Sequence, residues 1–345
     1  MNISAETSAA TLDAAANGRV GDRTRERLAE VARLVGGGLA YVEAEIAEAA
    51  RHGAAPATQA AAHLIAGGGK RVRPAVALLA SACAGGPSPD AMEVAVVAEL
   101  LHLATLLHDD VIDDAGERRG QRAARVLWGN GISVLAGDLM LVHALERAHR
   151  LGCAETLAEL LGTLRALVDG EIVQMRGRTV VDPSLETYET IVRGKTASLF
   201  RWAMRAGARV TGAPREVVDA LGQSGEHLGV AFQIVDDVLD VDGDAAATGK
   251  TLFADLAEGK LALPLLLHVQ GTPAALARVE RARAGDREAA AELARDVLSS
   301  GACREARRRA LVEASAAREA LARLPESRSR DLLAALAADM VSRAA

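Results

Sequence analysis

The chain carries the same acidic pattern twice, and these carboxylates are the side chains best suited to chemistry. The first copy is Asp109-Asp110-Val111-Ile112-Asp113 and the second is Asp236-Asp237-Val238-Leu239-Asp240. An apolar run typical of a buried helix leads into each copy. A buried carboxylate costs free energy unless a positive charge compensates it. Two such copies in core helices therefore indicate several positive charges between them, and divalent metal ions are the simplest source.

The spacing within each copy brings its outer carboxylates onto one helix face. Residues four apart lie one turn above each other, so Asp109 and Asp113 point into one space, as do Asp236 and Asp240. His102 falls on the same stripe as the first pair. Carboxylate oxygens suit Mg²⁺, which bridges to substrate phosphates, and the sequence has no Cys/His cluster of the kind that binds zinc. Two facing pairs that hold Mg²⁺ would bind a diphosphate and stabilise it as a leaving group.

A solvated helix end that makes only surface ion pairs is the alternative interpretation of either copy. Its occurrence twice, each time within an apolar helix, argues against that alternative.

Basic clusters flank both acidic motifs and suit phosphate binding. The segment Gly67–Pro74 places Lys70, Arg71 and Arg73 after a glycine run at an expected helix start. Glycines let backbone N–H groups approach an anion, and a helix N-terminus favours negative charge. It is not a Walker loop, because Lys70 is not followed by Ser or Thr. Any one basic residue alone is more simply a solvated surface group, but the grouping favours phosphate sites. The other basic residues near the motifs are Arg118, Arg119, Lys195, Lys250 and Lys260.

Helices are expected to position all of these side chains. Apolar residues recur at three- and four-residue intervals from Arg25 onward, with no convincing two-residue period of a strand. Alanine is abundant and aromatic residues make up only 2% of the chain, which favours helices over sheets. No long Pro/Ser-rich linker divides the chain. The sequence therefore predicts a disordered leader over residues 1–20 and one all-helical domain over residues 21–345, with long helices around a cavity.

Charge and composition limit the function classes. The 345-residue chain is 50% hydrophobic with a net charge of −6, which argues against a general nucleic-acid surface. No uncharged apolar run approaches the ~20 residues that span a bilayer, and residues 1–20 lack the pattern of a signal peptide. The cysteines Cys83, Cys153 and Cys303 are widely separated, which fits a reduced compartment. We therefore expect a cytoplasmic protein without a transmembrane segment.

Taken in order, these motifs resemble the trans-isoprenyl diphosphate synthases, also called polyprenyl synthetases, from about Arg25 to the C-terminus. Each matching segment is modest alone, but the ordered set is specific. The resemblance implies the all-α isoprenoid synthase fold, usually a homodimer, with three Mg²⁺ ions when substrate is bound. The matching segments are Gly69–Pro74, Leu107–Asp113, Arg118–Gly120, Trp128–Asn130, Gly170-Glu171 with Gln174, Lys195–Ala197, Phe232–Asp237, Gly249-Lys250 and Asp255–Lys260.

The resemblance also implies a reaction, head-to-tail prenyl transfer. An allylic diphosphate loses its diphosphate to give a carbocation, the double bond of isopentenyl diphosphate attacks, and a proton leaves. By position, the metal would be bound by Asp109, Asp113 and Asp236, supported by Asp110, Asp237 and Asp240. The allylic diphosphate would be held by Arg118, Lys195 and Lys250, and isopentenyl diphosphate by Lys70, Arg73, His102 and Arg119. Thr196 and Gln233 would face the developing cation, and Lys260 joins the substrate-binding set. The expected catalytic residues are Asp109, Asp113, Lys195, Thr196, Gln233 and Asp236.

Product length is expected to depend on the residues just before the first motif. In this family, bulk at that point closes the tunnel in which the product grows. Ala104 and Thr105 are both small here, and Leu101, one turn earlier, is the candidate floor. By resemblance the product is C20 or longer, with transient membrane contact on its release. Two departures from the family pattern, Gln121–Ala123 and Leu139, bear on the loop shape and the tunnel lining.

Three alternative functions would use the same fold and the same metal-binding motifs. One is a synthase of shorter farnesyl or geranylgeranyl diphosphate. A second is a class I terpene cyclase, which needs only one diphosphate site, whereas Lys70, Arg73 and His102 indicate another. The third is a non-catalytic subunit that regulates a partner synthase. Such subunits typically lack an acidic motif, and both motifs are intact here.

Overall fold

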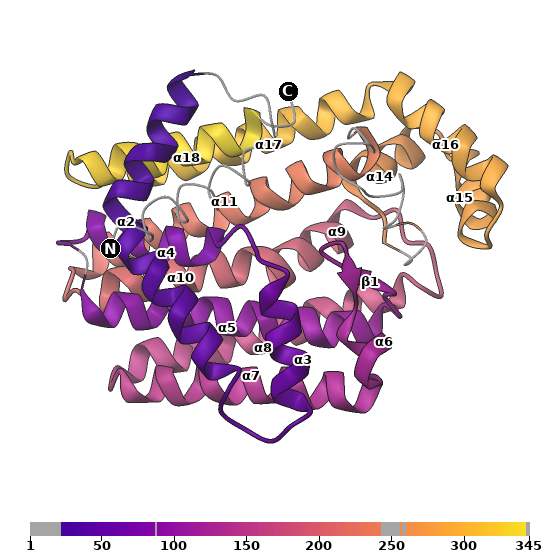
Figure 1. Cartoon of the computed structure of the whole chain (residues 1–345). Coiled ribbons are helices and arrows are strands. Elements are labelled where there is room, and N and C mark those ends of the chain that lie inside the picture. The colour runs from indigo at the N-terminus through magenta and orange to yellow at the C-terminus, as the bar shows by residue number, and fades with distance from the viewer. Residues whose placement is uncertain (1–21, 87, 243–255, 257–259, 343–345) are drawn as a thin grey trace. The chain divides into compact units, whose positions relative to one another are not determined.

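The structure is a computed structural model, and it describes residues 22–86, 88–242, 256 and 260–342. Over these residues the fold is all-α, apart from one short hairpin (Figure 1). The described residues form two compact units. Unit 1 comprises residues up to Leu160 with 202–222 and Leu324–Leu333, and unit 2 comprises 161–201, 223–323 and the residues from Ala334. The predicted leader lies outside the described residues, and the single domain stays a prediction.

Unit 1 is built around one long apolar helix, α5, which packs most extensively against α7 and also contacts α2 and α4. Residues 202–209 of α10 (Ser198–Arg209) and the first turns of α8 (Ala154–Arg176), α11 (Arg215–Asp242) and α18 (Arg328–Ser342) complete most of this unit. Its other elements are α2 (Asp22–Ala49), α3 (Ala57–Ala66), α4 (Val72–Cys83), α5 (Pro89–Ile112), β1 (Glu117–Arg118), β2 (Gln121–Arg122), α6 (Ala124–Trp128) and α7 (Asn130–Arg150).

Local sequence explains where α5 begins. Ser88 is its N-cap, with Oγ accepting a hydrogen bond from Ala91 N at 3.1 Å, and Pro89 follows at the first helical position. By length and composition α5 is apolar enough to cross a membrane, but 67% of its apolar window is buried inside the protein. It is the one such helix among the described residues, and this burial is what a core helix of a folded domain requires.

A short hairpin follows α5 and adds two strands of two residues each to the all-α fold that the sequence predicts. β1 pairs antiparallel with β2, with Arg118 opposite Gln121. The two turn residues, Arg119 and Gly120, have φ of 54° and 73°, as a tight two-residue hairpin requires. Strands of two residues are too short to show a period in the sequence. The departure at Gln121–Ala123 therefore lies in the second strand and the cap of α6.

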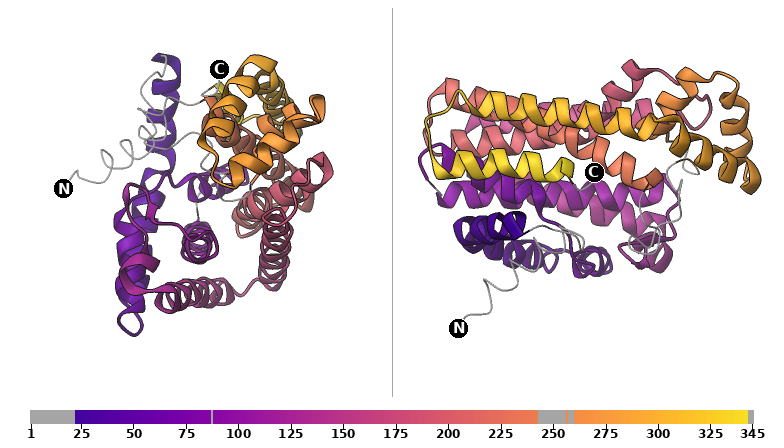
Figure 2. Two further views of the ribbon diagram at one scale, coloured as in Figure 1. Left: turned by 90° about the vertical axis from the view of Figure 1, so that its right-hand side faces the viewer. Right: turned by 90° about the horizontal axis from the view of Figure 1, so that it is seen from above.

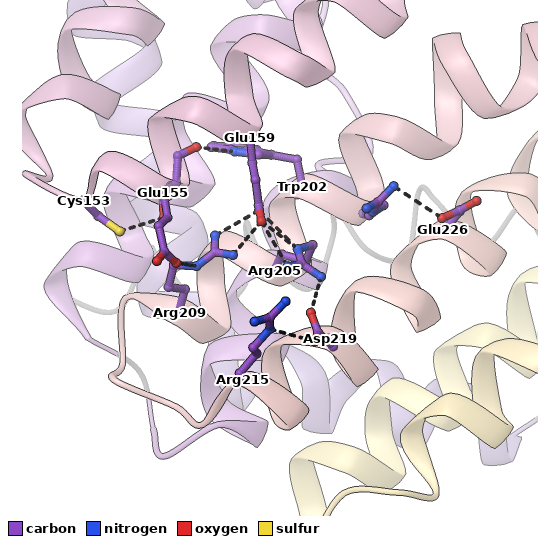
Figure 3. Close-up of polar contacts among 11 residues, drawn as sticks. Cys153, Glu155, Glu159, Trp202, Arg205, Arg209, Arg215, Asp219 and Glu226 are labelled. Atoms are coloured by element: carbon purple, nitrogen blue, oxygen red, sulfur yellow. Dashed lines mark hydrogen bonds and ion pairs between the residues drawn. The ribbon is translucent and has the colours of Figure 1, made fainter.

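An ion-pair network joins α8, α10 and α11 within unit 1 (Figure 3). Glu159 accepts from Arg205 Nη2 at 3.0 Å and from Arg209 Nη2 at 2.6 Å. Arg205 Nη1 also donates to Asp219 at 2.7 Å. Burial alone would raise the pKa of Glu159, but the two arginines outweigh it and the pKa is lowered. The network therefore holds a carboxylate ionised where three helices meet.

Unit 2 contains the remaining parts of α8, α11 and α18 and a run of shorter helices. Two apolar clusters form its core, one centred on α11, α14 and α17 and the other on α14, α15 and α16. The pair α15 and α16 packs as a helical hairpin (Figure 2). The shorter elements are α9 (Leu185–Val192), the π-helical turn η1 (Arg193–Ala197), α14 (Leu263–Gly271), α15 (Ala275–Arg283), α16 (Arg287–Ser300) and α17 (Ala302–Leu321).

Candidate active site

The first acidic motif closes α5 in unit 1. Asp109 and Asp110 lie in the last turn, and Asp113 is the C-cap with helical dihedral angles of φ −85° and ψ 0°. Asp113 N donates to Asp109 O at 2.7 Å, so the two residues stand one helical turn apart, as the spacing predicts. Asp109 and Asp113 are half-buried, whereas Asp110 is completely buried.

Asp110 is held by the hairpin. Arg118 Nη2 lies 2.6 Å and Nε 2.7 Å from Asp110 Oδ1. The other oxygen, Oδ2, is buried without a hydrogen-bond partner among the described residues. Burial raises the pKa of Asp110 and outweighs the opposing effect of Arg118. A further positive charge beside this carboxylate would reverse that shift, because a bound cation favours the ionised form.

The residues predicted to bind a second diphosphate also lie in unit 1. Lys70 is exposed, while Arg73, His102 and Arg119 are half-buried. Burial lowers the pKa of His102 far below its usual range, and the charges of Arg73 and Arg119 lower it further. His102 is therefore neutral at pH 7, so it can bind a phosphate oxygen by hydrogen bonding. Arg119 Nη1 is buried without a hydrogen-bond partner among the described residues.

The second acidic motif lies near the end of α11 in unit 2. Asp236 is half-buried, and Asp237 and Asp240 are buried. Asp237 accepts hydrogen bonds from Tyr188 Oη at 2.7 Å and from Leu263 N at 2.9 Å, which ties α11 to α9 and α14. Burial, and then the charge of Asp237, raise the pKa of Tyr188 far above its usual range, so its hydroxyl stays a donor.

The residues predicted to face the developing cation lie on η1 and α11. Thr196 Oγ1 donates to Gln233 Oε1 at 2.8 Å, and Gln233 Nε2 donates to Asp237 at 2.9 Å. Lys195, also on η1, forms an ion pair with Glu171. A π-helical turn inside a longer helical segment is a frequent mark of a functional site. Thr196, Gln233 and Asp237 therefore form a hydrogen-bonded chain within unit 2, and Lys195 pairs separately with Glu171.

The remaining predicted residues have different positions. Lys260 is half-buried just before α14. Lys250 lies outside the described residues. Leu101 and Ala104 are buried within α5. Thr105 is half-buried, and its hydroxyl donates to the His102 carbonyl at 2.8 Å, so its polar atom is already occupied by the helix backbone.

The carboxylates suit a hard divalent cation, although they do not form a complete coordination shell. Among the described residues, no group of three or more Asp, Glu, His or Cys side chains is arranged to hold a metal ion. The two motifs supply oxygen atoms, with neither thiolate nor imidazole, and one buried oxygen of Asp110 has no hydrogen-bond partner in the part of the chain that the structure describes. Mg²⁺ characteristically takes one or two carboxylates and completes its shell with water and phosphate oxygens. The residues present therefore fit Mg²⁺.

Four residues that the motif analysis did not single out stabilise those that it did. Tyr188 donates to Asp237, and Glu171 pairs with Lys195. Glu43 and Glu99 both bind Arg71, in the glycine loop. Glu171 lies in one of the segments that carry the family resemblance. The sequence offered no signal for Tyr188, Glu43 or Glu99.

The fold and these side chains define a class of protein. Long helices carry aspartates in their last turns, with arginines and a lysine bound to neighbouring carboxylates. Such sites suit enzymes that bind diphosphate esters through divalent cations and basic side chains.

Comparison with known proteins narrows that class. The family model described as polyprenyl synthetase matches residues 55–299. The octaprenyl diphosphate synthase of Haemophilus influenzae is 37% identical over 278 residues, covering 80% of this chain and 84% of its own. A short chain isoprenyl diphosphate synthase of Methanothermobacter thermautotrophicus is 36% identical over 289 residues, covering 81% and 88%. The polyprenyl synthase of Caulobacter crescentus CB15, whose crystal structure is a complex with calcium and isoprenyl diphosphate, has a TM-score of 0.85 at 35% identity, covering 93% and 98%.

The chain belongs to the polyprenyl synthetase family. It is therefore a prenyltransferase, and its fold is the all-α isoprenoid synthase fold that the sequence predicts.

Proposed function

We propose that the protein condenses isopentenyl diphosphate head-to-tail with an allylic diphosphate, uses Mg²⁺, and makes a polyprenyl diphosphate of C20 or longer. The observation that carries the proposal is that unit 1 holds two sets of side chains suited to bind anions. One is the carboxylate motif with Arg118, which suits a metal-bound diphosphate. The other is the metal-independent set of Lys70, Arg73, His102 and Arg119. A terpene cyclase has no use for the second set, and a non-catalytic subunit has no use for an intact first motif.

The proposed roles of the side chains follow the family resemblance. Asp109, Asp113 and Asp236 would hold Mg²⁺, which supplies Lewis-acid stabilisation of the departing diphosphate. Arg118 binds Asp110 and would turn its remaining N–H groups toward the same diphosphate. Lys195 would contribute charge from η1, where Glu171 fixes its direction.

The hydrogen-bonded chain from Thr196 to Gln233 suits a carbocation that exists only briefly. Gln233 donates its amide N–H to Asp237, which leaves its carbonyl oxygen on the side of Thr196. A fixed oxygen dipole stabilises developing positive charge without reorganisation. The apolar cluster around α11 would exclude the water that quenches a carbocation.

The test is direct. Purified protein is incubated with Mg²⁺, labelled isopentenyl diphosphate and geranyl, farnesyl or geranylgeranyl diphosphate, and the products are sized by chromatography. Incorporation of label into chains of C20 or longer supports the proposal. Release of a cyclic hydrocarbon without consumption of isopentenyl diphosphate would instead identify a cyclase, and inactivity with every primer would identify a regulatory subunit.

Product length can be tested at the small residues of α5. Ala104 is buried, so Ala104→Phe adds a ring where the proposed tunnel passes. We expect the longest product to shorten by at least one five-carbon unit, because overpacked space cannot accommodate the growing chain. Chromatographic sizing against wild type measures the shift. An unchanged product distribution would mean that the tunnel runs elsewhere, and Thr105→Phe, one residue further on, tests the neighbouring face.

We also propose that the protein is a homodimer. Along α8, Leu161, Val168, Ile172 and Met175 are each 43–57% exposed at helical spacing, which makes an apolar stripe on unit 2. An exposed stripe of this kind suits burial against a second copy. Light scattering should give twice the chain mass for wild type and a smaller mass for Ile172→Asp. The control Leu311→Asp, at an exposed leucine on α17, should leave the mass unchanged.

A further inference from the structure

The glycine loop contains one cation that behaves unlike its neighbours. Lys70 is exposed and Arg73 is half-buried, whereas Arg71 between them is 3% exposed. Its side chain turns inward and meets two glutamates. Arg71 Nη1 lies 2.5 Å from Glu99 Oε1, and Arg71 Nε lies 2.6 Å from Glu43 Oε1. Arg71 thus bridges α2 and α5 rather than facing a ligand.

The backbone at Arg71 is strained in the same place. Its φ of 47° and ψ of 35° are left-handed, a conformation that a residue with a side chain rarely adopts. Such a conformation persists only where surrounding contacts impose it, and here the two glutamates provide those contacts. Arg71 is also the N-cap of α4. Its conformation therefore sets the direction of Lys70 before it and of Arg73 after it.

The guanidinium of Arg71 also lies near that of Arg119. A Cβ added to Gly69 would be 2.7 Å from Arg71 Nη1 and 3.0 Å from Arg119 Nη2, so both arginines line the same face of the loop. Burial lowers the pKa of Arg119, and the charge of Arg71 lowers it further, while Glu99 and Glu43 act in the opposite direction. The glutamates are thus within electrostatic reach of Arg119.

Either Arg71 or Arg119 could neutralise the two glutamates, and the choice decides whether Arg119 is available to a ligand. Glu99 is 2% exposed, and a carboxylate buried to that extent needs a partner. Arg71 is that partner. Arg119 therefore keeps a buried donor, Nη1, without a hydrogen-bond partner among the described residues. Without Arg71, Arg119 is the adjacent cation that Glu99 and Glu43 would attract.

We infer that Arg71 is a positioning residue for isopentenyl diphosphate: it occupies Glu43 and Glu99, fixes the glycine loop, and thereby leaves Arg119 to bind the diphosphate. The inference rests on the proposed function only for the identity of that ligand. It assigns Arg71 no contact with substrate.

The test separates positioning from both direct binding and general stability. Arg71→Met should raise the KM for isopentenyl diphosphate at least about tenfold and leave the KM for the allylic diphosphate unchanged, because one charge-assisted contact is lost at one site. The triple variant Arg71→Met/Glu43→Gln/Glu99→Gln removes the competing carboxylates as well. It should recover most of the wild-type KM.

A matched control forms ion pairs with the same two helices, α2 and α5. Arg147, on α7, pairs with Glu45 on α2 and with Glu93 on α5 at 2.8 Å, but it lies outside the glycine loop. Arg147→Met should lower thermal stability without changing either KM. An equal rise in KM for isopentenyl diphosphate in this control would assign the effect to helix packing and overturn the inference.

The other outcomes are equally decisive. Folded Arg71→Met with an unchanged KM overturns the inference. A triple variant that stays impaired overturns the claim that Arg71 acts by occupying Glu43 and Glu99. If Arg71→Met does not fold, the triple variant, which leaves no buried carboxylate from this cluster, carries the test through its KM.

Calorimetric binding of isopentenyl diphosphate in metal-free buffer separates this inference from the proposed function. It compares the same variants without turnover. The carboxylate-lined site repels a diphosphate when no cation is present, so binding reports on the isopentenyl diphosphate site. An inactive wild type would refute the proposed reaction, while the same ordering of dissociation constants among the variants would still support the role of Arg71. Equal constants in wild type and Arg71→Met would refute that role.

Discussion

Replacing Asp109 or Asp236 by alanine is expected to reduce prenyl transfer by about 10³-fold while the helices remain folded. Each residue is half-buried near the C-terminal end of a long helix, α5 or α11. Alanine is a strong helix former, so the backbone should tolerate the change. What is lost is an oxygen ligand of the cation that stabilises the departing diphosphate. Initial rates with saturating isopentenyl diphosphate measure the loss, and circular dichroism measures helix content.

Each motif offers a neighbouring acid as its matched control. Asp114 follows the first motif and pairs with Arg125, and Asp242 follows the second and pairs with Arg307. The Asp114 side chain is 83% exposed and that of Asp242 is 36% exposed. Asp114→Ala and Asp242→Ala should therefore keep rates within about threefold of wild type, since exposed ion pairs contribute little. Near-normal rates in both Asp109→Ala and Asp236→Ala would refute the metal assignment.

Asp237 is expected to respond differently from Asp236, although the two are adjacent in the sequence. Tyr188, Gln233 and the Leu263 amide all donate to its carboxylate. A substitution there leaves buried donors without an acceptor, which costs stability as well as rate. Loss of activity at Asp237 alone would therefore not distinguish metal binding from folding.

The features that follow from local rules could be predicted from the sequence. The Ser88 cap needs only a hydroxyl before a proline and an apolar run, and the turn between Asp109 and Asp113 needs only helical spacing. The family resemblance predicted roles for the other motif residues, because it compares whole segments. The relation of the two acidic motifs to each other across the chain stays a prediction.

The partners of the motif residues could not be predicted, because they depend on packing between distant segments. Arg71 and Glu99 are 28 residues apart, and Tyr188 and Asp237 are 49 apart. No short spacing rule joins such residues. The π-helical turn at η1 was equally inaccessible, because it differs from an α-helix by hydrogen-bond register and not by residue type.

That turn leads to the second large expected effect, at a glycine close to Lys195. A Cβ on Gly194 would lie 2.7 Å from the Ala166 carbonyl oxygen and 3.2 Å from Gly170 Cα. Both obstacles are backbone atoms of α8, so they cannot rotate away. Gly194→Ala must push η1 away from α8, and Lys195 and Thr196 move with it. We expect kcat to fall about 10²-fold, with a loss of stability of about 1–3 kcal/mol.

Gly162 provides the control, because it lies on the same helix α8 with open space around it. Gly162→Ala should retain kcat and gain up to about 1 kcal/mol of stability, as an alanine in an exposed helix does. Rates and thermal midpoints of both variants are compared under one set of conditions. A stable Gly194→Ala enzyme with wild-type kcat would contradict the role of η1.

If Gly194→Ala is unstable, Gly170→Ala decides the matter. Its Cβ would lie 3.1 Å from Lys195 Cγ, an atom of a flexible side chain, and 3.1 Å from the backbone N of Lys195. That smaller displacement should lower kcat more than it lowers the thermal midpoint, because the geometry of the ammonium group matters more to the reaction than to the fold.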